Sequence, residues 1–413
     1  MAILLIYNQQ NGAKMLTSIR KLERKILREV PSDYKRYLYH EIDFGSQMIG
    51  VVGARGVGKT TLLLQYIKKL KQKTDPYKSL YFSYDYPSNI GIKLIELAEN
   101  FYKIGGQYLI IDEIHKYREF SIDLKAIYDF YPKLKVIFTG SCAISIYNAQ
   151  ADLSRRVVLY SMNGLSYREF LELKLNINLP HYSIEELLQK SPQIVNELED
   201  RFLPLEHFEE YLTFGYYPFY FRDKNQYLRL LNAVVNQTID IDLVNLGLVK
   251  QSFADKLKKL LLVISESNPF ELNITKIATN IEVSRNTLYS YLNNLDRGGL
   301  LNIVASGKKG ISKLSKPEKL YLNNTNLFYI FATESKIGTI RETFFVSQVK
   351  HLHQLDIPTK GDFLVDSKYT FEVGGEGKGF KQIKDVENSY LVIDTDSTEN
   401  PKKIPLWLFG FLY

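Results

Sequence analysis

The segment Gly53-Ala-Arg-Gly-Val-Gly-Lys-Thr60 has the residue types and the spacing of a loop that binds nucleotide phosphates. Its glycines allow successive backbone N–H groups to converge on phosphate oxygens without clashes from Cβ atoms. Lys59 would neutralise charge on the β- and γ-phosphates, and Thr60 would offer its hydroxyl to Mg²⁺. We therefore expect ATP or ADP and Mg²⁺ as cofactors. The residues expected to contact the nucleotide are Gly53, Ala54, Arg55, Gly56, Val57, Gly58, Lys59, Thr60 and Thr61.

The residues on either side of this loop favour phosphate binding over an ordinary glycine-rich turn. The apolar run Met48–Val52 comes before the loop, and a helical pattern begins directly after it. A strand followed by this loop and a helix is the context that phosphate binding requires. The N-terminus of that helix would add a favourable dipole for the phosphates.

A second apolar run, Tyr108–Ile111, ends in the two carboxylates Asp112 and Glu113. Asp112 is expected to bind Mg²⁺ together with Thr60, and Glu113 to orient and polarise the water that attacks the γ-phosphate. Charged residues also end many strands without any function. The functional interpretation of this pair therefore depends on the phosphate-binding loop upstream. The catalytic residues expected from the sequence are Glu113, Lys59 and Arg156.

Three further positions carry weaker signals, and each has a plain structural alternative. Thr139 or Ser141 could hydrogen-bond the γ-phosphate or the attacking water, although Thr-Gly-Ser is also ordinary turn chemistry. Arg155 or Arg156 could act as an arginine finger that cancels transition-state charge, or could form a salt bridge at the edge of the sheet. Pro218 could belong to a turn that contacts the adenine, or to a plain loop.

The elements that would position these residues alternate between strands and helices. We expect strands at 47–52, 79–84, 107–111, 135–139 and 157–160, and helices at 60–71, 89–103 and 122–130. This alternation predicts an α/β fold with a parallel sheet covered by helices on both faces. Because ligands bind at the carboxyl ends of such strands, Asp112 and Thr139 would lie near the loop.

Together these motifs resemble those of a widespread group of bacterial and archaeal P-loop ATPases. The group has an AAA-type core, a winged helix and a C-terminal domain related to restriction endonucleases. The resemblance rests on the loop and on the segments 109–115, 138–141, 152–156 and 164–170. It implies ATP binding and hydrolysis, and it implies that the strand of Thr139 lies between the strands that precede the loop and carry Asp112.

The rest of the chain divides by pattern, and the parts expected are an ATPase core at 1–163, a helical lid at 164–265, a winged helix at 266–335 and a nuclease-like α/β domain at 336–413. The lid shows helical spacing at 165–175, 184–190, 205–214 and 227–246. The last part shows a helix at 341–353 and strands at 362–365, 369–373, 390–393 and 406–411.

The winged helix offers a possible contact with DNA. A short helix at 274–278 and a second at 284–292 suit a helix-turn-helix, with a wing formed by 300–304 and 320–322 and a basic tip at 307–310. Arg285 and Arg297 are the only cations between 284 and 297. A strong DNA reader usually carries more positive charge, so a structural or protein-binding role stays open.

The C-terminal part has the carboxylates of an endonuclease-like site but departs from its pattern. Glu342, Asp362 and Glu372 could bind a metal ion, yet Gly374 stands where the resemblance implies a lysine that polarises water. Lys378 or Lys381 could reach that place. We expect this domain to be inactive as a nuclease.

Composition sets the outer limits of these interpretations. The 413 residues carry 53 Lys and Arg against 46 Asp and Glu, a mildly basic balance that permits nucleic-acid contact without demanding it. The single Cys142 excludes an internal disulfide and fits a reducing cytosol. No targeting segment and no apolar run long enough for a membrane span is visible, so we expect a soluble, cytoplasmic protein.

Three classes of function stay open at this point. The first is an ATPase that acts as a nucleotide-controlled switch or a DNA-associated enzyme, slow or stimulated by a partner. The second is a DNA-processing motor or nuclease of a defence or mobile-element system. The third is a nucleotide-binding scaffold with little turnover. The partners expected are nucleotide, DNA through the winged helix, and a protein partner or further copies of the chain.

Overall fold

The computed structural model describes residues 2–140, 153, 155–244, 247–267, 273–306, 319–332 and 336–413. Ser141 and the wing tip at 307–310 lie outside these ranges. The chain divides into two compact units, Met1–Met162 and Asn163–Tyr413. The finer division into a core, a lid, a winged helix and a nuclease-like domain stays a prediction.

The first unit contains the strands β1 (Met48–Val52), β2 (Ser79–Ser83), β3 (Tyr108–Asp112), β4 (Lys135–Gly140) and β5 (Val158–Ser161). Its helices are α1 (Ala2–Arg28), α2 (Leu38–Glu41), α3 (Lys59–Lys73), α4 (Leu94–Lys103) and α5 (Phe120–Phe130). The predicted strands and helices between 47 and 161 are all present, with ends that differ by a few residues.

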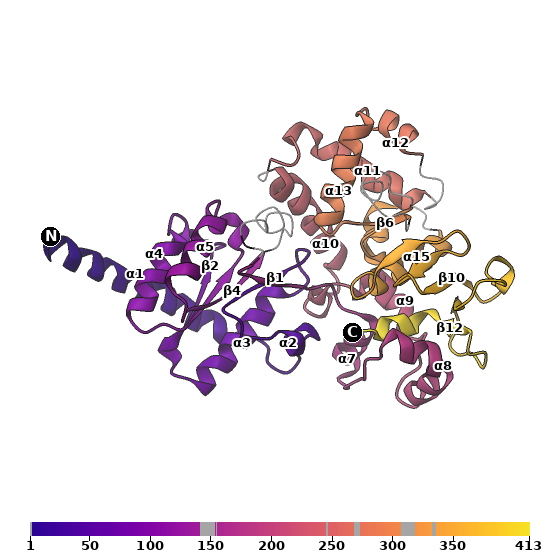
Figure 1. Ribbon diagram of the computed structural model, residues 1–413, viewed down its shortest axis with the longest axis horizontal. Helices are drawn as coiled ribbons and strands as arrows, with labels where there is room; N and C mark the ends of the chain where they lie inside the picture. The colour runs from indigo at the N-terminus through magenta and orange to yellow at the C-terminus, as the bar shows by residue number, and fades with distance from the viewer. Residues whose placement is uncertain are drawn as a thin grey trace. The chain divides into compact units, whose positions relative to one another are not determined.

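The strands of the first unit form a parallel sheet in the order β2-β3-β4-β1-β5. In Figure 1, α4 and α5 lie on one side of these strands and α3 lies on the other. The inner strands are buried on both faces, which explains why they read as continuous apolar runs, whereas the edge strand β5 is partly exposed. The strand β4 lies between β1 and β3, as expected, so the ends of all three are neighbours.

The long helix α1 packs against α4 and β2, and its N-terminal part extends beyond the sheet (Figure 1). Its buried Glu23 accepts a hydrogen bond from the backbone N–H of Tyr81 at 2.9 Å and pairs with Lys71 at 3.2 Å. Burial raises the pKa of Glu23, while the nearby Lys71 ammonium opposes that rise. The helix is thus tied to the outer strand of the sheet by a paired buried charge.

The second unit contains the helices α7 (Tyr167–Leu175), α8 (Ile184–Glu199), α9 (Phe208–Glu210), α10 (Tyr227–Gln237), α11 (Ala254–Glu266), α12 (Ile274–Asn280), α13 (Arg285–Arg297), α14 (Phe328–Phe331) and α15 (Ile337–Val349). Its strands are β6 (Leu301–Ser306), β7 (Lys319–Leu322), β8 (Leu355–Ile357), β9 (Phe363–Val365), β10 (Tyr369–Gly375), β11 (Ser389–Asp394) and β12 (Lys403–Pro405). They form one mixed sheet in the order β12-β11-β10-β9-β8-β6-β7.

The helix-turn-helix pattern corresponds to α12 and α13, and Ser284 caps α13 by accepting a hydrogen bond from the backbone N–H of Thr287 at 3.1 Å. The hairpin β6–β7 follows, and β6 also pairs with β8. The expected wing strands therefore belong to the same sheet as the C-terminal strands.

One prediction about the second unit is wrong. Leu406–Phe411 is a 3-10 helix and not a strand. All six of its residues are buried, so the run has no polar alternation that would distinguish a strand from a buried helical turn. Within the described part of the chain, no helix has both the length and the apolar character needed to cross a membrane.

Candidate active site

The phosphate-binding loop connects β1 to α3, and its backbone depends on glycine. Gly53, Gly56 and Gly58 have φ values of 157°, 85° and 106°, conformations that residues with a Cβ rarely adopt. A Cβ at Gly53 would lie 2.2 Å from the carbonyl oxygen of Met162. The loop therefore passes so close to the backbone after β5 that only glycine fits at its first position.

Lys59 begins α3 and is almost fully buried. Its ammonium donates hydrogen bonds to the carbonyl oxygens of Gly53 and Ala54, at 2.9 and 2.7 Å. The side chain of Lys59 thus lies across the loop and contacts its first two residues. Arg36 is also buried and donates a hydrogen bond to the carbonyl of Val57 at 2.7 Å, which holds the backbone of the loop in place.

Asp112 ends β3 beside the loop, and three hydroxyl groups converge on its carboxylate. Thr60 Oγ1 lies 3.1 Å from Oδ1 and 3.0 Å from Oδ2. Tyr81 Oη donates to Oδ2 at 2.9 Å, and Thr139 Oγ1 donates to Oδ1. Burial raises the pKa of Asp112, and the hydrogen bonds from the three hydroxyls oppose that rise because they favour the charged form.

Glu113 follows immediately and adopts the left-handed conformation, with φ 55° and ψ 42°. Its backbone N–H donates to Thr139 Oγ1 at 3.1 Å. Its Oε2 is buried and has no hydrogen-bond partner among the described residues. Burial, and then the charge of Asp112, raise the pKa of the Glu113 carboxyl. A strained backbone and an unsatisfied buried carboxylate oxygen are both typical of a functional group.

His115 lies next to this carboxylate, with Nε2 3.6 Å from Glu113 Oε2, which is too long for a hydrogen bond. Burial lowers the pKa of His115 to about 3, and the positive charges of Arg55, Lys59 and Lys116 act in the same direction. The imidazole is therefore neutral at physiological pH.

The structure brings together most of the residues singled out from the sequence. Lys59, Thr60, Asp112, Glu113 and Thr139 meet at the carboxyl ends of β1, β3 and β4. Direct contact of Thr139 with a nucleotide stays a prediction.

Two further expected site residues are not among these contacts. Arg156 pairs with Asp129 of α5, with Nε 3.1 Å from Oδ1 and Nη2 3.2 Å from Oδ2, which is the salt-bridge alternative. Its role as an arginine finger stays a prediction. Pro218 begins a 3-10 helix, Pro218–Phe221, in the second unit. Its contact with adenine also stays a prediction.

Tyr81 and His115 are residues of the site that the sequence analysis does not predict. Tyr81 lies in the middle of β2 and reaches Asp112 only because β2 pairs with β3. His115 comes two residues after Glu113, and this closeness in sequence is the one feature that indicates a place near the site. For Tyr81, the neighbouring strand had to be known before its hydroxyl could be placed.

Comparisons with known proteins find one family model that matches the part of the chain carrying these residues. The AAA domain family matches residues 45–171, which include the loop, Asp112, Glu113 and Thr139. The match shows that residues 45–171 are similar to P-loop domains of the AAA type. A second match, to a domain of unknown function (DUF8612), covers residues 205–336 of the second unit.

An uncharacterized protein, MJ1637 of Methanocaldococcus jannaschii, is 26% identical over 330 residues, covering 76% of this chain. The chain spans 66% of that relative, just under two thirds of its length.

Among solved structures, the Walker-type ATPase PABY2304 of Pyrococcus abyssi is 15% identical with a TM-score of 0.38, over 72% of this chain and 95% of that one. AMPPCP-bound DnaA from Aquifex aeolicus is 14% identical with a TM-score of 0.24, over 67% and 88%. TM-scores of this size do not establish a shared arrangement of the whole chain.

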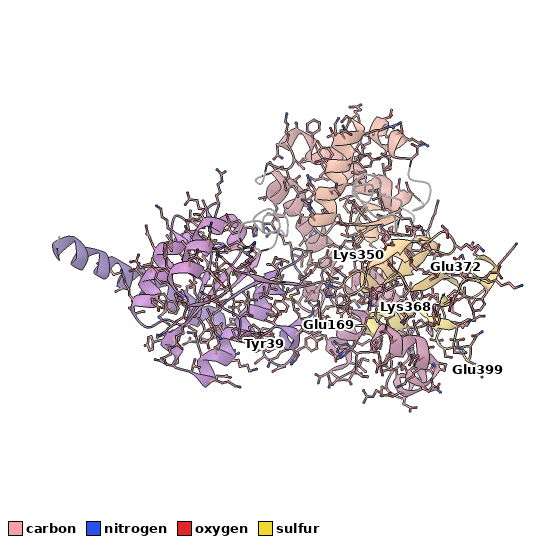
Figure 2. All side chains as sticks on the ribbon, viewed as in Figure 1. Tyr39, Glu169, Lys350, Lys368, Glu372 and Glu399 are labelled. Carbon is pink, nitrogen blue, oxygen red and sulfur yellow. The ribbon has the colours of Figure 1, made fainter. Side chains whose placement is uncertain are left out.

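The three C-terminal carboxylates expected from the sequence do lie in one region of the second unit, where Figure 2 marks Glu372. Lys319 of β7 is fully buried, with Nζ 3.4 Å from Glu342 Oε2 and 3.4 Å from Asp362 Oδ1. Lys378 pairs with Glu372 at 2.5 Å, and its stem covers Gly374. The stem of Lys378 thus fills the space that a side chain at position 374 would enter.

This C-terminal cluster does not fit a metal ion. The Lys319 ammonium lies between two of its carboxylates, Tyr321 Oη donates to Glu342 Oε2 at 2.6 Å, and the Val373 N–H donates to Asp362 Oδ2 at 2.9 Å. Within the described ranges, no group of three or more His, Cys, Asp or Glu side chains could hold a metal. Two ammonium groups, those of Lys319 and Lys378, thus pair with the three carboxylates of the cluster.

Proposed function

We propose that the first unit binds ATP with Mg²⁺ and hydrolyses it to ADP and phosphate. The observation that carries the proposal is the meeting of Thr60, Asp112 and the unsatisfied carboxylate of Glu113 beside a loop with three glycines at positive φ. A phosphate-binding loop, a metal-binding pair and a base for water are the parts that phosphoryl transfer to water requires.

Each residue would have a separate role in this reaction. The loop N–H groups and Lys59 would bind the β- and γ-phosphates and neutralise their charge. Glu113 would accept a hydrogen bond from the attacking water, directing its oxygen at the γ-phosphorus while the bond to the β-phosphate oxygen breaks.

Mg²⁺ fits the donor chemistry of the site. The Thr60 hydroxyl and the Asp112 carboxylate are hard oxygen donors that lie within 3.1 Å of each other. These two residues would hold the ion, and Mg²⁺, when bound, withdraws negative charge from the phosphates. Burial raises the pKa of Asp112, and a bound cation would oppose that rise by favouring the ionised form.

The second unit would bind the partner on which ATP hydrolysis acts, and DNA is the first partner to test. The exposed residues of α13, among them Arg285, Asn286 and Ser290, offer donors and acceptors to a phosphate backbone or to base edges. The neutralised cluster around Lys319 supports a DNA-associated ATPase or a switch over a nuclease.

Steady-state phosphate release, with and without Mg²⁺ and with single- or double-stranded DNA, tests the proposal. We expect release that requires Mg²⁺, with no cleavage of the DNA. Stimulation by DNA would identify a DNA-associated enzyme, and indifference to DNA would identify a switch that answers to a protein partner. ATP binding without release under every condition would overturn hydrolysis and leave a nucleotide-binding scaffold.

A further inference from the structure

The carboxylate of Asp112 is held from both sides by the strands that flank its own. Since β3 lies between β2 and β4, Tyr81 approaches from one neighbour and Thr139 from the other. Tyr81 Oη donates to Oδ2 at 2.9 Å, while Thr139 Oγ1 donates to Oδ1. Each carboxylate oxygen therefore has a donor of its own, and the plane of the group is fixed.

The Thr139 hydroxyl makes two hydrogen bonds in this arrangement, one as a donor and one as an acceptor. A threonine hydroxyl has one proton, which here goes to Asp112, and its lone pair accepts the Glu113 N–H at 3.1 Å. Thr139 thus fixes the metal-binding carboxylate and the backbone of the neighbouring Glu113 together. On the other side, Tyr81 is buried, with 2% of its surface exposed, and burial raises the pKa of its phenol, so the hydroxyl stays a donor.

We propose that Tyr81 is a positioning residue for Mg²⁺, acting through Asp112 as one half of a clamp whose other half is Thr139. The inference rests on the proposed ATPase function. A carboxylate that is turned away from the Thr60 hydroxyl would meet the cation poorly, and the two flanking donors prevent that rotation. Partners that orient metal ligands typically change metal affinity by about 10- to 100-fold when they are removed.

Tyr84 provides a matched control for the loss of a buried hydroxyl. It lies just after β2 and is buried, and its hydroxyl donates to the carbonyl of Ile92 at 3.3 Å. Its ring packs on Phe82 and Tyr117. Tyr81→Phe and Tyr84→Phe each remove one oxygen from the same part of the unit, but only the first removes a donor to Asp112.

The experiment measures binding of a fluorescent ATP analogue by the full chain as Mg²⁺ is titrated, with a second titration of the analogue in EDTA. We expect Tyr81→Phe to raise the Mg²⁺ concentration at half-saturation by about tenfold. Its affinity for the analogue in EDTA should equal that of the wild type, and Tyr84→Phe should match the wild type in both titrations.

Two results would overturn the clamp in distinguishable ways. Wild-type Mg²⁺ dependence in Tyr81→Phe would overturn the clamp alone. Nucleotide binding by the wild type that ignores Mg²⁺ would overturn the metal-dependent function and the clamp together. If Tyr81→Phe does not fold, Thr139→Val and Thr139→Ser test the other half. The valine should shift the Mg²⁺ dependence and the serine should restore it, and equal behaviour of these two variants would contradict the clamp.

Discussion

Two lysines of α3 donate hydrogen bonds to backbone carbonyls of the first unit. Substituting each of them separates an effect on nucleotide binding from an effect of losing a charge. Lys59 donates to the carbonyls of Gly53 and Ala54, and Lys68 on the same helix donates to the carbonyl of Val30 at 3.0 Å. Only the first of these lysines borders the proposed phosphate site.

Lys59→Met should weaken ATP binding by about 10- to 100-fold, since a hydrogen bond to a charged group contributes about 1.5–3 kcal/mol. Lys68→Met should bind ATP like the wild type. Equilibrium binding of a fluorescent ATP analogue measures both. Equal affinities for the two variants would show that the phosphates bind somewhere other than this loop.

His115 gives a prediction about pH. Its pKa is about 3 in the folded protein against 6.5 for an exposed histidine, so the unfolded chain binds one more proton between these values. The contribution of His115 to stability therefore falls as pH drops below about 6.5, by at most about 1.4 kcal/mol per pH unit. The raised pKa values of Asp112 and Glu113 act in the opposite sense, but both groups remain in a His115 variant.

His115→Gln should consequently lose less stability than the wild type between about pH 7 and pH 5.5, by about 1 kcal/mol. Unfolding in urea at the two pH values measures the difference. An identical loss in both proteins would mean that His115 is already protonated, or exposed, in the folded state.

At the scale of elements, the contact between the phosphate-binding loop and the end of β5 makes a sharp prediction. Gly53→Ala would place a Cβ 2.2 Å from the backbone oxygen of Met162, and backbone cannot move aside as a flexible side chain does. We expect a loss of stability of about 2 kcal/mol or more, together with weakened nucleotide binding. Gly377→Ala, where no atom lies within 4 Å of the added Cβ, is the control in a thermal unfolding experiment. Equal unfolding temperatures for the two variants would contradict the contact.

The elements also show where sequence reasoning succeeds and where it stops. The strands of the first unit could be predicted because β1, β2, β3 and β4 are apolar runs separated by helical patterns. The resemblance implies that β4 lies between β1 and β3, and the pairing of these three strands confirms it. The prediction of a strand at Leu406–Phe411 is wrong, because a short apolar run fits a strand and a buried helical turn equally well.

The candidate site was predictable where its residues follow one another in a motif. Thr60, Asp112 and Glu113 end or begin elements that the sequence already indicates. Tyr81 could not be found in this way, because its role depends on which strand lies beside β3 and on how far its hydroxyl reaches. Lys319 likewise contacts Glu342 and Asp362, which are distant from it in sequence, only because the chain folds these segments together.

At the scale of the whole molecule, the proposed catalytic groups Lys59, Thr60, Asp112 and Glu113 lie in one compact unit, Met1–Met162. That unit has a parallel sheet and a hydrophobic core of its own. A fragment of residues 1–162 should therefore fold cooperatively and bind ATP in the presence of Mg²⁺. Circular dichroism and nucleotide titration of the purified fragment test this. An unfolded fragment would show that the second unit is needed to complete the first.

The most direct test of the account compares ATP turnover with ATP binding in Glu113→Gln and the wild type. The substitution keeps the size of the side chain and removes the carboxylate that would polarise water. The Oε2 atom of this carboxylate has no hydrogen-bond partner among the described residues. We expect the variant to bind ATP with wild-type affinity and to release phosphate at least about 100-fold more slowly, within the range that general base catalysis contributes. Turnover at the wild-type rate would contradict the account, because Glu113 would then not be the group that activates water.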